Sequence, residues 1–551
     1  MTGPLLTLLN ASTLAAYTAA GYWGRETLYA VSRRHARNAQ GGWAARDRRR
    51  RLSYAALVEA ADRLAGRLAA QGLRPGDRVA VWLPSSLETA VGLLACSRNG
   101  YVCCPSLHRT HTVGQVVALV DRMRAAAVIA QPGYGADADR CDIFELLADR
   151  KHLRWMWRVG SSEAPPFAGL PNEHTELPAS RDPNQVMYLP FTSGTMGMPK
   201  GVLHSDNTLL ASARMMARDW ALDGAVLYTL SPLSHNLGLG AFVTTLAVGG
   251  ELVVHDLPRG ESLVDRLEET GAEFLFGVPT HAIDLLAEMR ARGLRRLGAV
   301  RGFRISGAAA PAQLVADLMD HGVVPQSGYG MTETCSHQYT RPDDPPPRII
   351  ETSGRACEGY ELRIWRQDDP DIEAEPGEIG EIGGRGASLM LGYFDDQTAT
   401  DAAFNADGWF MTGDLGCIDA AGYLRITGRK KDVIIRGGRN IHPMPIEALA
   451  SNHPAVEQAA AFPVPDSRLG ERVCLAIVPA IGATLDPIAL VAHLSAGGVP
   501  TPDLPEFILL LTAMPLTASG KIVKRELIRW VEEGRTRPEP VRLARPAQVE
   551  V

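Results

Sequence analysis

The chain has 551 residues, which is too long for one compact core and predicts a large domain with at least one smaller one. Its composition, with 46% hydrophobic and 21% charged residues, is that of an ordinary soluble globular protein. A formal net charge of −6 gives no general reason to expect binding to nucleic acid or to an anionic membrane. The basic run at residues 48–51 is therefore expected to be a solvated turn.

Cysteine spacing and hydropathy exclude further classes. The eight cysteines are scattered, and Cys103 and Cys104 are adjacent, so we expect reduced, mostly buried thiols and no zinc site. The N-terminus has no basic start and no clear cleavage pattern, which argues against a signal peptide. No apolar stretch approaches the roughly 20 residues that span a bilayer. These features predict a soluble, cytoplasmic protein without a membrane span.

Helical and strand patterns alternate along the first part of the chain. Residues 54–71 and 87–98 have apolar residues at helical spacing, and residues 78–83 and 101–104 are typical of buried strands. Further strands are predicted at residues 126–130, 225–230, 251–255, 274–278 and 302–306. Strands separated by helices predict stacked, mostly parallel sheets that are covered on both faces. The predicted fold class is α/β.

The pattern changes after about Glu361. Short strands and Gly-rich turns predict a small β-rich subdomain there. From Val456 the alternation returns, with segments at 473–478, 487–495 and 507–512, which predicts a small α+β C-terminal domain. The Pro- and Arg-rich tail from Thr536 is expected to be poorly ordered.

The sharpest local signal is the string FTSGTMGMPKG at residues 191–201. Glycines let backbone amides approach an anion, hydroxyls donate to phosphate oxygens, and a lysine adds a cation. The candidate ligands are Thr192, Ser193, Gly194, Thr195, Gly197 and Lys200. The string does not satisfy GxxxxGK[ST], so it is not a Walker A loop. It predicts a cradle for a polyphosphate.

This string resembles the phosphate-binding loop of the adenylate-forming (ANL) superfamily: acyl- and aryl-CoA synthetases, adenylation domains of peptide synthetases, and firefly-type luciferases. Further strings that resemble superfamily signatures follow in the expected order: SPLSHNLG (231–238), GYGMTE (328–333), DGWFMTGD (407–414), TGRKKD (427–432) and PLTASGK (515–521). The resemblance covers nearly the whole chain. It departs at Met196, where the family usually has a hydroxyl residue, and this removes one hydrogen bond worth roughly 1.5–3 kcal/mol at most.

The resemblance implies that ATP activates a carboxylic acid as its acyl-AMP, with release of pyrophosphate, and that the acyl group passes to coenzyme A. Two anions must meet in this reaction, so Mg²⁺ and cations have to balance the developing charge. By resemblance, Glu333 is the magnesium-linked glutamate, Thr332 faces the α-phosphate and Tyr329 packs on adenine. Asp414 resembles the carboxylate that accepts hydrogen bonds from the ribose hydroxyls, and Arg429 meets the same ribose.

Three further features follow from the same resemblance. Lys521 resembles a mobile lysine that bridges the substrate carboxylate and the α-phosphate. Lys431 lies at the family's hinge, which implies an AMP-binding domain at residues 1–429 and a mobile C-terminal domain at 430–551. Gly437 and Gly438 would line a tunnel for the pantetheine thiol, where backbone without side chains is needed.

The acid is expected to bind beside the SHNLG string. By resemblance, the acyl pocket includes His235, Asn236, Leu239, Gly307, Ala309, Gly330 and Met331, and Gly307 and Ala308 also contact the nucleotide. His235 is either a gate that shields the carboxylate or a packed core residue. The His-Asn pair and residues 349–359 resemble 2,3-dihydroxybenzoate-AMP ligases, whereas residues 101–109 and 436–447 resemble cyclohexanecarboxylate-CoA ligases. Both resemblances favour a compact, cyclic or aromatic acid.

Several alternatives remain open. The acceptor could be the phosphopantetheine of a carrier protein, although no carrier attachment segment is visible in the chain. A medium- or short-chain acyl-CoA synthetase, a ligand-binding pseudoenzyme and a luciferase-like oxygenase share the fold, but no substituted catalytic residue favours the pseudoenzyme. We expect a monomer or homodimer.

Overall fold

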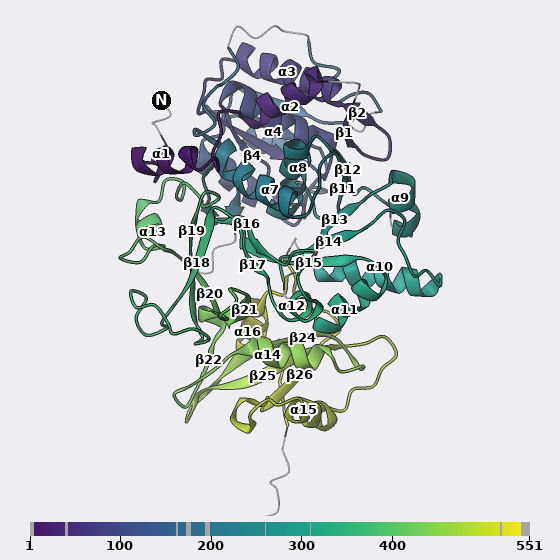
Figure 1. Cartoon of the computed structure of the whole chain (residues 1–551), viewed down its shortest axis with the longest axis vertical. Coiled ribbons are helices and arrows are strands. Elements are labelled where there is room, and N and C mark those ends of the chain that lie inside the picture. The colour runs from purple at the N-terminus through teal and green to yellow at the C-terminus, as the bar shows by residue number, and fades with distance from the viewer. Residues whose placement is uncertain are drawn as a thin grey trace, which may run out of the picture. The chain divides into compact units, whose positions relative to one another are not determined.

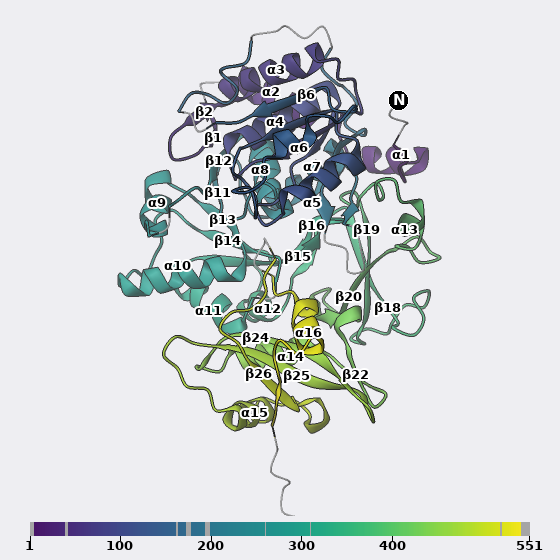
Figure 2. The same ribbon diagram turned by 180° about the vertical axis from the view of Figure 1, so that it is seen from behind.

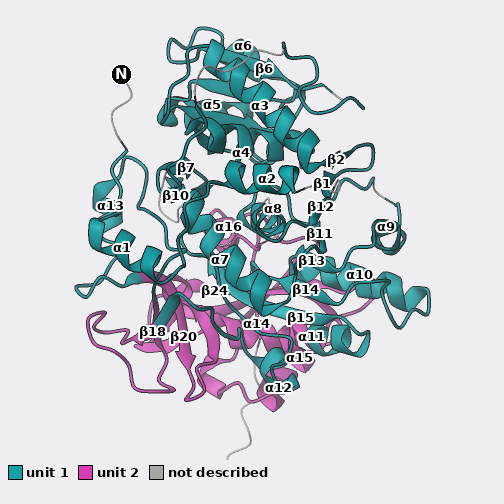
Figure 3. Cartoon of the chain, turned by 45° about the horizontal axis from the view of Figure 1, so that its top comes forward, with its two compact units in different colours: residues 1–310, 314–362, 384–410 teal, residues 311–313, 363–383, 411–551 magenta. Residues whose placement is uncertain are grey.

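The computed structural model describes residues 5–38, 42–160, 163–171, 178–192, 199–258, 260–308, 310–517 and 521–541. The chain divides into two compact units (Figure 3). Unit 1 comprises residues 1–310, 314–362 and 384–410, and unit 2 comprises residues 311–313, 363–383 and 411–551. The predicted domains, residues 1–429 and 430–551, are defined by a hinge about which they would move. This division stays a prediction.

Unit 1 contains a six-stranded sheet of order β10-β7-β4-β3-β5-β6. Its strands are β3 (Arg78–Trp82), β4 (Val102–Cys104), β5 (Ala127–Ala130), β6 (Trp155–Arg158), β7 (Val186–Tyr188) and β10 (His204–Ser205). Neighbouring strands pair in parallel except β10, which runs antiparallel to β7.

A nine-stranded sheet of order β17-β16-β15-β14-β13-β11-β12-β1-β2 lies in the same unit. Its strands are β1 (Trp43–Arg46), β2 (Arg51–Ser53), β11 (Val226–Thr229), β12 (Glu251–Val254), β13 (Phe274–Gly277), β14 (Gly302–Ile305), β15 (Val324–Met331), β16 (Cys335–Tyr339) and β17 (Arg355–Ala356). The central pairs from β1 to β15 are parallel, and both ends of the sheet carry antiparallel pairs.

The helices of unit 1 cover both sheets (Figures 1 and 2). They are α1 (Ala11–Ala19), α2 (Leu28–Arg37), α3 (Tyr54–Ala70), α4 (Leu87–Asn99), α5 (Val113–Met123), α6 (Ile143–Leu147), α7 (Asp206–Asp219), α8 (Asn236–Val248), α9 (Leu263–Thr270), α10 (Pro279–Ala291), α12 (Pro346–Glu351) and α13 (Gln397–Asp401), with most of α11 (Ala312–Asp320). None of the described helices is long and apolar enough to cross a bilayer.

Alternating strand residues show why both faces of each sheet are covered. Val79 of β3 packs in one core with α3, α4, α7 and α8, whereas the next residue, Ala80, packs with α5 and α6. In β13, Phe274 belongs to the α7–α8 core, and Leu275 packs with α9 and α10. Helices α7 and α8 therefore lie in a layer between the two sheets, and the predicted α/β class with stacked, mostly parallel sheets is confirmed.

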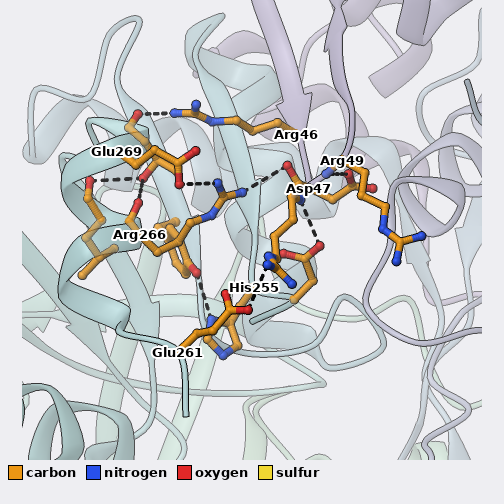
Figure 4. Close-up of polar contacts among 12 residues, drawn as sticks. Arg46, Asp47, Arg49, His255, Glu261, Arg266 and Glu269 are labelled. Atoms are coloured by element: carbon orange, nitrogen blue, oxygen red, sulfur yellow. Dashed lines mark hydrogen bonds and ion pairs between the residues drawn. The ribbon is translucent and has the colours of Figure 1, made fainter. Parts of the chain in front are cut away.

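A polar network joins the β1–β2 connection to α9 (Figure 4). Arg266 of α9 donates to Glu269 at 2.8 Å and to the carbonyl oxygen of Asp47 at 3.1 Å. The basic run after Asp47 belongs to this region. Arg50 forms ion pairs with Asp47 at 2.7 Å and with Glu88 at 2.5 Å, and its side chain is only 10% exposed. For Arg50 the predicted solvated turn was wrong, because the carboxylates of Asp47 and Glu88 compensate its charge.

Unit 2 contains much of a four-stranded sheet of order β18-β19-β20-β21 and a six-stranded sheet of order β23-β22-β25-β26-β27, in which β24 pairs with β25. The strands are β18 (Tyr360–Trp365), β19 (Gly380–Gly386), β20 (Phe410–Ile418), β21 (Leu424–Arg429), β22 (Ile434–Arg436), β23 (Arg439–Ile441), β24 (Val456–Asp466), β25 (Gly470–Pro479), β26 (Phe507–Leu510) and β27 (Glu539–Pro540). The helices are α14 (Pro443–Ser451), α15 (Pro487–Ala496) and α16 (Lys524–Glu532), with 3₁₀ turns at Lys430–Asp432 and Thr501–Asp503.

The C-terminal tail corrects one expectation. β27 pairs antiparallel with β26, with Pro540 opposite Phe507. The prediction of a poorly ordered tail from Thr536 was therefore wrong for this strand, where backbone pairing orders the chain. Residues 542–551 lie outside the described part of the chain.

Candidate active site

The predicted phosphate loop starts and ends on a short antiparallel pair in unit 1. β8 (Phe191–Thr192) pairs with β9 (Lys200–Gly201), which places Thr192 opposite Lys200. The Thr192 hydroxyl donates to the carbonyl oxygen of Lys200 at 3.4 Å. The structure thus fixes both ends of the loop. The predicted ligands Ser193, Gly194, Thr195 and Gly197, and the departure at Met196, lie outside the described residues.

Lys200 and Glu333 are connected through one tyrosine. Lys200 Nζ lies 4.5 Å from the centre of the Tyr393 ring, a favourable cation–π contact. The Tyr393 hydroxyl donates to Glu333 Oε1 at 3.0 Å, and both side chains are buried. Burial, and then the charge of Glu333, raise the pKa of Tyr393, so its hydroxyl keeps its proton and remains a donor. The loop lysine and the predicted magnesium-linked glutamate are therefore held on one side chain.

A buried histidine fixes the backbone next to Glu333. His204 Nε2 lies 2.7 Å from the carbonyl oxygen of Thr332, and His204 Nδ1 lies 3.0 Å from Thr208 Oγ1. A carbonyl only accepts hydrogen bonds, so Nε2 carries the proton. Burial lowers the pKa of His204 to about 4, which keeps the ring neutral. On the other side of the same turn, a Cβ at Gly330 would lie 2.0 Å from the carbonyl oxygen of Cys335, so only glycine fits.

Three of the predicted nucleotide-binding residues lie on or just after neighbouring strands of the nine-stranded sheet. Tyr329 of β15 is buried, and its ring makes an edge contact with His337 at a centroid distance of 5.6 Å. Gly307 and Ala308 begin one residue after the end of β14, which is paired with β15. Ala309 lies outside the described residues. The structure therefore groups Tyr329, Gly307 and Ala308 at the carboxyl ends of adjacent parallel strands, where ligands commonly bind in α/β sheets.

A narrow cavity lies between α7, α8 and the nine-stranded sheet. Two predicted acyl-pocket residues, Asn236 and Leu239, line it. The remaining lining residues are Leu209, Ser212, Ala213, Met216, Gly240, Val243, Thr244, Phe276, Cys335 and Ser336. His235, Gly307, Gly330 and Met331 are not among the residues that line this cavity, so their contact with the acid stays a prediction.

His235 has a structural contact that bears on its two predicted roles. It is the N-cap of α8, and its Nδ1 accepts a hydrogen bond from the backbone N–H of Leu237 at 3.2 Å. His108 lies beside it with a ring-centre distance of 6.5 Å. The cap explains why a polar ring stands at this helix start. The proposed role of His235 as a gate that shields the substrate carboxylate stays a prediction.

In unit 2, the two predicted ribose-binding residues face each other. Asp414 of β20 pairs with Arg429 of β21, and Arg429 Nε lies 2.9 Å from Asp414 Oδ1. Asp414 is buried, whereas the Arg429 side chain is 45% exposed. Lys431 lies in the 3₁₀ turn that follows β21, and burial, with the nearby Arg429, lowers its pKa. The strand register thus brings together residues that are 15 positions apart in the sequence.

The predicted lysine and thiol-tunnel residues also lie in unit 2. The backbone N–H of Thr517 donates to the carbonyl oxygen of Lys521 at 2.7 Å, so the ends of the PLTASGK turn are tied together; residues 518–520 lie outside the described chain. Gly437 and Gly438 form the two-residue turn of the β22–β23 hairpin, with φ values of 57° and 81°. Such a turn requires positive φ at both positions, which by itself accounts for the glycines.

Sequence reasoning missed Tyr393, His204 and the contribution of α7 to the cavity. Tyr393 lies 60 residues after Glu333, outside the quoted strings. The small α7 residues Ser212 and Ala213 have the spacing of ordinary core positions, so nothing in the sequence marked them as lining residues. A histidine directly before the N-cap Ser205 was the one visible cue for His204.

The fold and the site define the class of protein. The family described as "AMP-binding enzyme" matches residues 32–394, and the family described as "AMP-binding enzyme C-terminal domain" matches residues 445–521. The first match covers more than half of the chain, so the chain belongs to the AMP-binding enzyme family. The predicted resemblance to adenylate-forming enzymes is confirmed.

Particular relatives span nearly the full length of the chain. It is 31% identical over 529 residues to the medium-chain fatty-acid–CoA ligase of Escherichia coli (strain K12), covering 94% of this chain and 92% of that protein. It is 33% identical over 546 residues to the salicyl-AMP ligase / salicyl-S-ArCP synthetase of Mycobacterium tuberculosis, covering 94% and 93%. Among solved structures, ATP-bound MatB from Rhodopseudomonas palustris superposes with a TM-score of 0.81 at 27% identity, covering 92% of this chain and 99% of that chain.

Proposed function

We propose that the protein is an AMP-forming carboxylic acid–CoA ligase that acts on a compact, cyclic or aromatic acid. The observation that carries this proposal is the Lys200–Tyr393–Glu333 contact in a chain of the AMP-binding enzyme family. It holds a cation for phosphate oxygens and a carboxylate for a metal ion next to the phosphate loop. We assign the cavity lined by Asn236 and Leu239 as the acyl site.

The reaction has two steps. In the first, a substrate carboxylate oxygen attacks the α-phosphorus of ATP and forms a new O–P bond. The bond between the α-phosphorus and the oxygen that bridges to the β-phosphate breaks, and pyrophosphate leaves. In the second, the thiolate of CoA attacks the acyl carbon and AMP leaves. We assign Thr192 and Lys200 to the phosphates, and Thr332, which His204 fixes through its carbonyl oxygen, to the α-phosphate.

The donor set of unit 1 fits Mg²⁺. Magnesium prefers hard oxygen ligands and is commonly held by one or two carboxylates together with substrate phosphates. Among the described residues no group of three or more His, Cys, Asp or Glu side chains could hold a metal ion. Glu333 is therefore the proposed protein ligand, with phosphate oxygens completing the set. When bound, the ion would neutralise negative charge on the phosphates.

The residues of unit 2 are assigned in the same proposal. Asp414 accepts from the ribose hydroxyls and Arg429 meets the ribose from the other side. Lys521 joins the substrate carboxylate and the α-phosphate in the first step, where a point charge on a flexible stem suits a changing geometry. Rotation about Lys431, between domains 1–429 and 430–551, then removes Lys521 for the second step. Gly437 and Gly438 line the thiol path.

Acid-dependent ATP–pyrophosphate exchange tests the proposal. A panel of aromatic, alicyclic and aliphatic acids is incubated with labelled pyrophosphate, ATP and Mg²⁺, and CoA is then added while AMP and thioester are quantified. We expect exchange with compact cyclic acids and stoichiometric thioester when CoA is present. Retention of neither ATP nor AMP by the purified protein with Mg²⁺ would contradict the proposal.

A carrier protein is the second candidate acceptor, because one relative is named a salicyl-AMP ligase / salicyl-S-ArCP synthetase. The exchange step would be the same for both acceptors, and only the thiol would differ. Incubation with free CoA alone separates them, since a carrier-loading enzyme would accumulate acyl-AMP and form little acyl-CoA. We place the enzyme in the cytoplasm, where ATP and CoA are available.

A further inference from the structure

Arg304 lies on the face of the nine-stranded sheet that meets the acyl cavity. In β14 it pairs with Phe276 of β13 and with Gln326 of β15. Residues paired across parallel strands project to the same face of the sheet, and Phe276 lines the cavity. Arg304 Nη1 also lies 3.7 Å from Sδ of Met216, another lining residue. The guanidinium therefore lies directly behind the cavity wall.

This guanidinium is a buried cation that no carboxylate of the described chain faces. The residue is 0% exposed, the side-chain carbonyl of Gln326 accepts from Nη1, and Cζ lies 5.8 Å from the centre of the Tyr339 ring. Arg304 Nε and Nη2 have no hydrogen-bond partner within the described chain, and no ion pair joins Arg304 to any described carboxylate. Burial lowers its pKa to about 10, so it stays charged at neutral pH. Buried charges are normally paired, because an unpaired one costs much free energy.

Other unused donors surround the guanidinium. The Gln326 side-chain amide nitrogen and both ring nitrogens of His337 lack partners among the described residues. His337 is 0% exposed, and burial, with the charge of Arg304, lowers its pKa to about 3, so its ring is neutral and keeps one N–H. It lies two residues before Tyr339, which pairs with Gly328 of β15, and therefore on the face that carries Gln326 and Arg304. A Cβ at Gly328 would lie 2.8 Å from the guanidinium, so glycine leaves space there.

We propose that Arg304, Gln326 and His337 bind a second, anionic oxygen group of the acyl substrate, so that the enzyme prefers compact acids that carry a further carboxylate. The planar fork of a guanidinium matches a carboxylate in a bidentate contact. The incoming oxygen replaces the weak thioether acceptor of Met216, whose unbranched side chain moves readily. This inference rests on the proposed function of the cavity, and it adds a specificity-determining residue to it.

Matched acids test the inference. Benzoate and cyclohexanecarboxylate are compared with benzene-1,3-dicarboxylate and cyclohexane-1,3-dicarboxylate, with 3-hydroxybenzoate as the uncharged analogue. The kcat/KM of acid-dependent pyrophosphate exchange is measured for the wild type, R304M and R304K. R301M is the matched control, because Arg301 precedes the same strand but donates to the carbonyl oxygens of Trp220 and Ala221. Thermal-shift titration with each acid gives a readout of binding that is independent of turnover.

We expect the wild type to favour each dicarboxylate over its parent acid. In R304M, kcat/KM for the dicarboxylates should fall about 10- to 100-fold, while the parent acids change less than about threefold. R304K keeps the charge without the planar fork, so its kcat/KM for the dicarboxylates should lie between those of the wild type and R304M. R304K serves as the test if R304M does not fold. No wild-type preference, or an equal loss for both kinds of acid, would overturn the inference. Exchange with none of the acids would instead refute the proposed function.

Discussion

Replacement of Asp206 by asparagine should change how the stability of the protein depends on pH. Asp206 starts α7 and is 0% exposed. Its Oδ1 accepts from the backbone N–H of Leu28 and from the Ser97 hydroxyl, both at 2.8 Å, whereas Oδ2 has no partner among the described residues. Burial raises the pKa of Asp206 to about 7 from 3.8. A protonated carboxyl therefore persists in the folded state where the unfolded chain is ionised.

The sign and size follow from linkage. Because the folded pKa is raised, the unfolded state binds fewer protons, and stability falls as the pH rises from about 4 to about 7. At about 1.36 kcal/mol per pKa unit, the full effect is about 4 kcal/mol, of which about 3 kcal/mol is lost between pH 5 and pH 8. Asparagine keeps the oxygen acceptor and cannot ionise, so D206N should avoid this loss.

Urea unfolding of the wild type and D206N at pH 5 and pH 8 measures the difference directly. We expect the variant to gain about 3 kcal/mol over the wild type between the two pH values, because other titrating groups cancel in the comparison. Asp139, with a side chain 77% exposed, gives the control variant D139N, which should show no such gain. A difference between D206N and wild type that is the same at both pH values would refute the reasoning.

Three further predictions concern the two reaction steps. Tyr393→Phe keeps the ring under Lys200 but removes the hydrogen bond to Glu333, so kcat/KM for MgATP in pyrophosphate exchange should fall about 10- to 100-fold; an unchanged value would remove Tyr393 from its positioning role. Lys521→Ala should abolish exchange while largely sparing CoA transfer from pre-made acyl-AMP, and equal loss in both steps would contradict its assignment. Gly438→Val should slow thioester formation while exchange persists; Gly482→Val introduces the same left-handed strain elsewhere in unit 2 and should affect neither step.

The sequence predicted the elements with strong periodicity. The apolar strands β3 and β11 to β14 and the helices α3 and α4 lie within one or two residues of their predicted ranges, because burial on both faces leaves a continuous apolar signal. The short strand β2 was missed, since Arg51–Ser53 has little apolar character and is stabilised by pairing with β1. Such pairing depends on partners that local patterns do not show.

The sequence identified the site residues that lie within the signature strings, but not the contacts between separate strings. Asp414 and Arg429 come from two separate strings, and the antiparallel register joins them. The Tyr393–Glu333 hydrogen bond connects one quoted string to an unquoted segment, so only the folded chain shows it. The sequence shows a charged residue, Arg304, inside an apolar strand segment, but only the folded structure shows that no described carboxylate faces it.

The position of the proposed acyl cavity within the helical layer between two sheets constrains how substrate range can evolve. Leu209, Met216 and Leu239 line the cavity and also belong to the main core of unit 1, so each is shared between recognition and folding. Shortening such a side chain to admit a bulkier acid removes about 2–5 kcal/mol of packing in the empty protein. Ligand binding could restore part of that loss. Variants with new selectivity should therefore arise more readily from a stabilised ancestor than from a marginal one.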